Sequence, residues 1–95
     1  MTITAIHPGE HLAQELEALR MSAADLARQL KVPTYRLTAI LNGQLAATGD
    51  TALRLGHFFG TSPEFWLNAQ RAIDLWEAAR SIKGQINHIS PLTAA

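Results

Sequence analysis

The stretch from Ser22 to Gly43 constrains the fold most, because it reads as a helix, a sharp turn and a second helix. Ser22 suits an N-cap, since its hydroxyl can accept from a free backbone amide, and the apolar residues of 23–30 then share one face. Residues 31–33, Lys-Val-Pro, interrupt this helix, because the residue before a proline is pushed out of the helical region. Two short helices joined by a tight turn are therefore predicted.

The second helix of this stretch should begin near Pro33 or Thr34 and end at Gly43, which suits the left-handed position after a helix. Apolar residues at i, i+3 and i+4 face inward; they are Leu37, Ile40 and Leu41. The outer face then carries Thr34, Tyr35, Arg36, Thr38 and Ala39. Such a pair is either a DNA-binding helix-turn-helix or an ordinary pair of core helices, and the hydroxyl-rich outer face beside an arginine favours DNA.

Length and composition limit the number of domains and the classes of protein to which the chain can belong. The chain has 95 residues, enough for one core, and its apolar content of 47% is that of a globular protein. It has no cysteine, which excludes disulfides and thiolate metal sites, and no apolar run of transmembrane length. We expect an all-α, cytoplasmic protein without a cofactor. No catalytic constellation or phosphate-binding glycine loop is present, so an enzyme is not expected.

The charges are unevenly distributed although the formal net charge is zero. Residues 20–54 carry five Lys or Arg against two Asp, whereas residues 1–19 carry three Glu and neither Lys nor Arg. The positive field therefore lies on the helix-turn-helix stretch, as DNA binding requires. So few cations predict modest non-specific affinity and a need for dimerisation.

Three further helices are predicted around this stretch. One begins at His7-Pro8-Gly9-Glu10 and runs to about residue 20 with a buried stripe of Leu12, Leu16 and Leu19. Another runs from a cap at Thr48 or Asp50 to Gly60, and Gly56 within it marks close approach to another helix. The last spans 63–80, capped by Ser62 or by Thr61 in a capping box. His7 and His11 lack a third ligand, so no metal site is expected.

The last helix is apolar over more of its circumference than one contact requires, with two tryptophans. It either fills a small core or also forms a second contact surface, and the latter predicts a homodimer through Trp66, Ile73 and Trp76. We expect residues 1–80 to form the domain, with the motif at 22–43 and the dimerising helix at 63–80, and residues 81–95 to form a C-terminal tail.

Several motifs together resemble a known family. The helix-turn-helix resembles that of phage repressors, also called the xenobiotic-response-element family, except that Lys31 stands where that family usually has glycine. HPGE at 7–10, LNG at 41–43, DTALRL at 50–55 and GTSPEFWL at 60–67 narrow the resemblance to HigA-type antitoxins, or addiction-module antidote proteins. The resemblance implies a five-helix phage-repressor-like domain. It also implies a homodimer that represses its own operon and neutralises a toxin that cleaves messenger RNA.

The resemblance also assigns DNA-contacting residues. The family's base-reading positions fall on Pro33, Thr34, Tyr35, Thr38 and Ala39. Phosphate contacts fall on Ser22, Arg36, Asn42 and Gln44. The expected partners are double-stranded DNA carrying an inverted-repeat operator and a cognate toxin. The candidate toxin contacts are the apolar tail from Ile82 to Leu92 and the face of the first helix that carries His7, His11, Glu15 and Glu17. A plain dimeric repressor without a toxin is the alternative.

Overall fold

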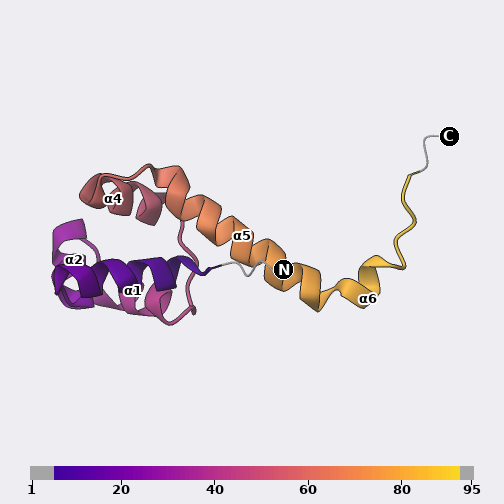
Figure 1. Ribbon diagram of the computed structural model, residues 1–95, viewed down its shortest axis with the longest axis horizontal. Coiled ribbons are helices and arrows are strands. Elements are labelled where there is room, and N and C mark those ends of the chain that lie inside the picture. The colour runs from indigo at the N-terminus through magenta and orange to yellow at the C-terminus, as the bar shows by residue number, and fades with distance from the viewer. Residues whose placement is uncertain (1–5, 93–95) are drawn as a thin grey trace.

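The computed structural model describes residues 6–92, which form helices and no strand. The helices are α1 (Pro8–Leu19), α2 (Ala23–Leu30), α3 (Thr34–Leu41), α4 (Gly49–Phe59), α5 (Pro63–Ser81) and α6 (Lys83–Ile86). The first four and the start of α5 form a compact body, from which the rest of α5 and α6 extend (Figure 1). The prediction of an all-α fold is confirmed, and α6 is an additional short helix in the segment expected to be a tail.

Most helices begin at a side-chain cap, which explains why their starts could be read from the sequence. Ser22 accepts from the Asp25 amide, and the Asp25 carboxylate accepts from the Ser22 amide, so the two close a capping box. Thr48 caps α4, and Ser62 rather than Thr61 caps α5. Local hydrogen bonds of this kind need no distant partner, so the sequence around each cap suffices to predict them.

The turn between α2 and α3 has the conformation expected of a helix-turn-helix. Lys31 lies in the left-handed region with φ 62°, a position that costs a non-glycine residue conformational energy. Pro33 has extended backbone and precedes the first residue of α3, so it is the N-cap of that helix. Gly43 ends α3 with φ 74°, as predicted.

The core lies where α1, α2, α3, α4 and the start of α5 meet. Its buried members are Leu12, Leu16, Leu26, Ala27, Leu30, Leu37, Ile40, Ala52, Leu55 and Trp66. The predicted stripe on α1 is correct except for Leu19, which is 49% exposed. Arg20 adopts a left-handed conformation that ends α1, and Met21 packs on the core instead.

Two glycines allow the backbone of one segment to touch another. A Cβ on Gly9 would overlap the carbonyl oxygen of Ile40, so the start of α1 lies directly against α3. A Cβ on Gly56 would lie 2.8 Å from the carbonyl oxygen of Thr61, so α4 touches the chain that starts α5. The close approach predicted at Gly56 is confirmed, whereas the one at Gly9 was not predicted.

The linker between α3 and α4 is held by a buried glutamine on α5. The side-chain oxygen of Gln70 accepts from the Ala47 amide over 2.8 Å, and its Nε2 donates to Asp74 over 2.9 Å. Gln70 is 8% exposed, so the bond satisfies an amide that water could not easily reach. None of the helices between residues 6 and 92 is long and apolar enough to cross a membrane.

Candidate nucleic-acid interface

Helix α3 presents a polar face to solvent because its apolar residues are fixed in the core. Leu37 and Ile40 are 0% and 1% exposed. The predicted base-reading residues occupy the other side: Pro33, Thr34, Tyr35 and Thr38 are exposed and Ala39 is half-buried. Tyr35 is 70% exposed, which excludes a role as a buried brace. The structure thus gathers these residues on one accessible helix face.

The start of α3 also offers backbone donors. Pro33 has no N–H and makes no side-chain cap, so nothing in the described residues occupies the first amides of α3 from a side chain. Free amides at a helix start bind phosphate or other acceptors readily, since the helix dipole is positive there.

Thr38 has its hydroxyl proton committed within the helix. Its Oγ1 donates to the carbonyl oxygen of Tyr35 over 3.1 Å and lies 3.5 Å from that of Thr34. The oxygen therefore presents lone pairs outward, and the methyl group remains exposed beside it. Against DNA such a side chain accepts from an adenine or cytosine amino group or touches a thymine methyl.

The predicted phosphate contacts lie at the ends of the two motif helices. Ser22 is exposed at the start of α2, and its oxygen already accepts from Asp25, which leaves its hydroxyl proton free to donate. Asn42 and Gln44 are exposed just after α3. These positions fit side chains that fix the register of a recognition helix while carrying no sequence information themselves.

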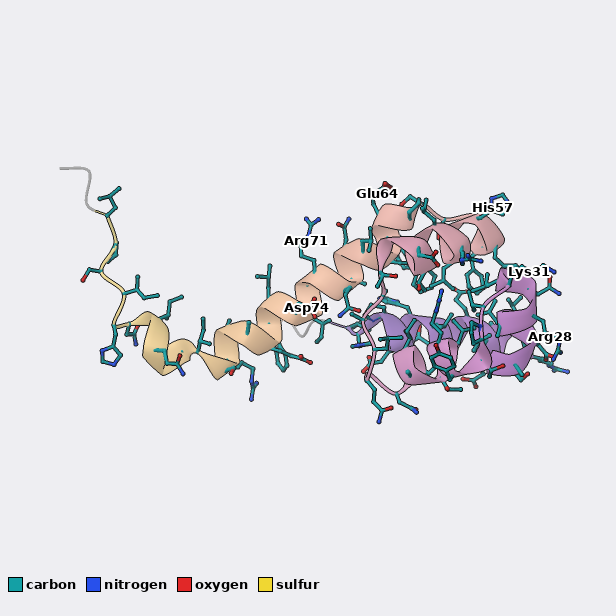
Figure 2. All side chains as sticks on the ribbon, turned by 180° about the vertical axis from the view of Figure 1, so that it is seen from behind. Arg28, Lys31, His57, Glu64, Arg71 and Asp74 are labelled. Carbon is teal, nitrogen blue, oxygen red and sulfur yellow. The ribbon has the colours of Figure 1, made fainter. Side chains whose placement is uncertain are left out.

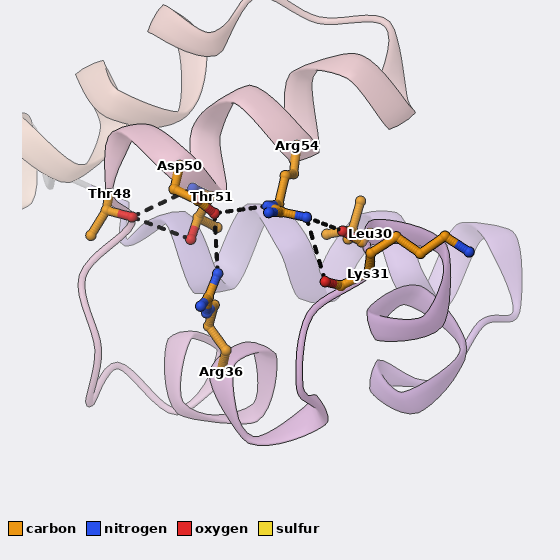
Figure 3. A network of polar contacts seen from close by, with 7 residues as sticks. All are labelled: Leu30, Lys31, Arg36, Thr48, Asp50, Thr51 and Arg54. Carbon is orange, nitrogen blue, oxygen red and sulfur yellow. Dashed lines mark hydrogen bonds and ion pairs between the residues drawn. The ribbon is translucent and has the colours of Figure 1, made fainter.

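Arg36, the remaining predicted phosphate contact, belongs to an ion-pair network (Figure 3). Its Nη1 donates to Asp50 Oδ1 over 3.1 Å, and Arg54 Nε donates to the same oxygen over 2.8 Å. Nη1 of Arg54 donates in turn to the carbonyl oxygen of Leu30 over 2.6 Å, with that of Lys31 at 3.4 Å. One chain of bonds thus joins α3, α4 and the turn after α2.

Asp50 is held in its charged form by this network. The hydrogen bond from Arg54 is the largest cause that lowers the pKa of the Asp50 carboxyl, and both arginine charges add to it. A lowered folded-state pKa means that the contribution to stability is complete above the ordinary carboxyl pKa and is lost as the pH falls through the lowered value. At neutral pH the carboxylate is therefore a permanent negative charge beside α3.

A second acidic group is engaged in a similar way at the start of α2. The backbone hydrogen bond from Ser22 is the largest cause that lowers the pKa of Asp25, and Arg28 forms an ion pair with the same carboxylate. Arg28 and Lys31 lie at the end of the body opposite the α5 extension (Figure 2). In the described residues Lys31 and Arg20 form no ion pair, so their charges are not cancelled locally.

Sequence reasoning missed the roles of Asp50 and Arg54. The two are spaced i, i+4 on α4, which is the spacing of a helical ion pair, and that signal was available. The link from Arg54 to the carbonyl of Leu30 spans 24 residues of sequence and has no local signature. Gln70 was missed for the same reason, because its partner Ala47 is 23 residues away.

The three residues expected at a dimer interface differ in how far they are buried. Trp66 is 1% exposed and its Nε1 donates to Thr61 Oγ1 over 3.0 Å, so it is a core residue of the single subunit, with little surface left for the predicted dimer contact. Ile73 is 7% exposed. Trp76 lies on the extended part of α5, half-buried, with the Arg80 guanidinium 4.7 Å from its ring centre.

The two histidines considered as metal ligands have other partners. His7 Nδ1 accepts from the Gly9 amide over 2.8 Å and caps α1, and the His11 ring packs against Phe65 at 5.3 Å between centres. Within residues 6–92 no group of three or more potential ligands is gathered for a metal ion.

The chain is similar to solved and curated proteins over almost its whole length, although no family model matches it. A HigA-family addiction-module antidote protein from Coxiella burnetii is 52% identical, with 95% of this chain and 100% of that chain covered and a TM-score of 0.89. The Pseudomonas aeruginosa antitoxin HigA, solved with the higBA promoter, is 40% identical, with coverages of 95% and 100% and a TM-score of 0.89. Virulence-associated protein I of Dichelobacter nodosus is 46% identical over 94% of this chain and 82% of its own length.

The two solved relatives share the fold of this chain over 95% of its length. They are an antidote protein and an antitoxin, which are not enzymes. Sequence identities of 52% and 40% indicate common ancestry as well as a shared fold. The chain therefore belongs to the HigA family of addiction-module antidote proteins.

Proposed function

We propose that this protein is the antitoxin of a toxin–antitoxin pair, and that as a homodimer it binds operator DNA to repress its own operon in the cytoplasm. One observation carries the DNA-binding part: the exposed hydroxyl-bearing face of α3 on a helix fixed by the buried Leu37 and Ile40. The Pseudomonas aeruginosa relative was solved with its promoter, which supports the same role here.

In this proposal α3 enters the major groove with its first turn towards the bases. Thr34 and Tyr35 bring hydroxyls, and Thr38 brings an acceptor oxygen and a methyl group. Ser22 and the residues after α3 hold phosphates on both sides. No strongly basic surface is needed, since base contacts in two half-sites supply the discrimination.

Thr34→Ala tests the base-reading assignment. The change removes an exposed hydroxyl from the first residue of α3 and should weaken operator binding by about 1–3 kcal/mol while binding to random duplex hardly changes. Fluorescence anisotropy with both duplexes at one salt concentration measures the two affinities. An equal loss on operator and random duplex would show that Thr34 does not read bases.

The dimer is proposed to form through the outer part of α5, not through Trp66. Beyond the body, α5 and the chain after it carry large apolar side chains that stay exposed: Leu75, 64% exposed, Ile82, 39%, Ile86, 51%, and Ile89, 67%. Trp76 lies on the same extension. An extended helix with this composition is stabilised when a second copy covers it.

Trp76→Ala should weaken dimerisation without unfolding the body. Aromatic anchors at interfaces commonly contribute about 2 kcal/mol or more, so the dissociation constant should rise by a factor of about 30. Analytical ultracentrifugation over a range of concentrations measures it. Leu53→Ala is the matched control, because Leu53 is 63% exposed on α4, away from the extension, and should leave the sedimentation of the dimer unchanged.

A toxin needs a surface that DNA and the second subunit leave free. The exposed side of α1 carries Glu10, Glu15 and Glu17, and none of the three forms an ion pair in the part of the chain that the structure describes. A toxin that acts on RNA is expected to be basic, so opposite charges would speed its association with α1. This acidic face is accordingly the proposed toxin contact.

Coexpression tests the antitoxin part. The small reading frame beside the gene for this protein should arrest growth when expressed alone, and this protein should relieve the arrest and form a complex that survives gel filtration. A triple change of Glu10, Glu15 and Glu17 to Gln should weaken that complex and leave operator binding intact. A harmless neighbour, or toxicity indifferent to this protein, would leave a plain dimeric repressor.

A further inference from the structure

The network around Asp50 places a negative charge against the one cation of the recognition helix. Within α3 Arg36 is the sole charged residue, and its Nη1 donates to Asp50 Oδ1 over 3.1 Å. The side chain of Asp50 is 57% exposed and that of Arg36 is 32% exposed, so both groups remain within reach of a bound duplex. DNA approaching α3 therefore meets an arginine whose positive charge is partly offset by a carboxylate that Arg54 shares.

Asp50 cannot easily move away when DNA approaches. Arg54 Nε holds the same carboxylate oxygen over 2.8 Å, and Arg54 is itself anchored to the carbonyl oxygen of Leu30 over 2.6 Å. The carboxylate thus has a fixed position relative to the turn and to α3 (Figure 3). The Asp50 carboxyl stays ionised at neutral pH, because the arginines lower its pKa.

A fixed carboxylate at this place affects operator and non-operator DNA differently. Non-specific binding comes almost entirely from cations that displace counterions at phosphates, so an arginine whose charge is partly offset contributes less to it. On the operator, base contacts hold α3 in register, and the arginine side chain has further N–H donors for one phosphate while Nη1 stays on Asp50. The ion pair then orients Arg36 for that phosphate.

We propose, on the basis of the DNA-binding function proposed above, that Asp50 is a specificity-determining residue: it orients Arg36 for an operator phosphate and suppresses binding to other DNA. Asp50 itself contacts no base in this role. It acts through Arg36 and is a positioning residue, held by Arg54. The consequence is a repressor in which the one cation of the recognition helix contributes little to binding of random sequence.

Asp50→Asn in the full chain tests the proposal, because asparagine keeps an oxygen acceptor for both arginines and removes the charge. Binding to the promoter fragment and to a random duplex of equal length is measured by anisotropy over about 50–200 mM salt. Random-duplex binding should tighten about threefold for each bound subunit at the low-salt end, and its salt slope should steepen by about 0.9 for each bound subunit. Operator affinity should change less, so the ratio of the two affinities falls.

Glu64→Gln is the matched control, since it removes one exposed negative charge from the start of α5, outside the extension through which the dimer is proposed to form. It should change random-duplex binding less than Asp50→Asn does. Arg36→Gln provides a second, independent arm: it should weaken operator binding and flatten its salt slope while random-duplex binding hardly changes. Circular dichroism establishes that each variant is folded. If Asp50→Asn does not fold, the binding data for Arg36→Gln test the proposal on their own.

Two results would overturn the inference about Asp50. In one, Asp50→Asn behaves as Glu64→Gln does, or tightens operator and random duplex equally. In the other, Arg36→Gln weakens both duplexes to the same degree, which would make Arg36 an ordinary phosphate contact. Failure of the proposed function is a different observation, namely that the parent protein itself does not prefer the promoter fragment.

Discussion

Trp66→Ala should lower the free energy of unfolding by about 3–5 kcal/mol, the range for removing a large aromatic side chain from a core. Trp66 is 1% exposed, and its ring packs against Phe59 and Phe65 at 5.8 Å and 5.1 Å between centres. The change also removes the donor to Thr61 Oγ1. For a domain of this size a loss of that order is a large share of the total stability.

Urea denaturation followed by circular dichroism measures this loss, with Trp76→Ala as the control in the same helix. Each variant deletes one indole ring. Because Trp76 lies on the extension, its removal should hardly change the free energy of unfolding of the body. The measurement is made at a concentration where both proteins are monomeric, so that dissociation does not add to the result. Equal losses from the two changes would mean that Trp66 does not anchor the core.

Gly9→Ala should also destabilise the fold, although alanine favours helices over glycine by about 1 kcal/mol. The added methyl would overlap the carbonyl oxygen of Ile40 and lie 3.1 Å from His7 Nδ1, the atom that caps α1. Backbone cannot move aside as a flexible side chain can, so we expect a net loss of about 1–3 kcal/mol, as for other overpacked sites. Because Ile40 is part of α3, operator binding should weaken as well.

Gly49→Ala is the control for that change. Gly49 is in the first turn of α4, as Gly9 is in the first turn of α1, but a Cβ there would meet nothing within 4 Å. It should leave the midpoint of thermal unfolding unchanged or raise it slightly. A Gly9→Ala protein as stable as the parent would show that α1 and α3 are not in direct backbone contact.

The sequence sufficed for those features that depend on neighbouring residues. The start of α2 follows from Ser22 and the end of α3 from Gly43, and the cap of α5 was narrowed to Ser62 or Thr61, because caps and left-handed glycines act within one helical turn. The outward face of α3 was predicted correctly for a similar reason. Its periodicity puts Leu37 and Ile40 inward and thereby fixes what faces solvent.

Features set by contacts between distant segments could not be predicted. Trp66 and Trp76 lie on one apolar helix, and the packing of its start against α4 and α1 decides that the first is buried and the second lies beyond the body. The ion pair of Arg36 depends on where α4 places Asp50, 14 residues further along the chain. The sequence shows the excess of positive charge in residues 20–54. How much of that charge is available to DNA depends on ion pairs such as that between Arg36 and Asp50, which form only in the folded chain.

The central claim is that a dimer of this protein recognises an inverted repeat in its own promoter through α3. Footprinting of the parent protein on the DNA upstream of its reading frame tests it most directly. We expect protection of two symmetry-related half-sites whose centres are about 34 Å apart, or a multiple of that, at concentrations that leave random duplex unbound. Protection of a single unpaired half-site, or equal binding to promoter and random DNA, would contradict the claim.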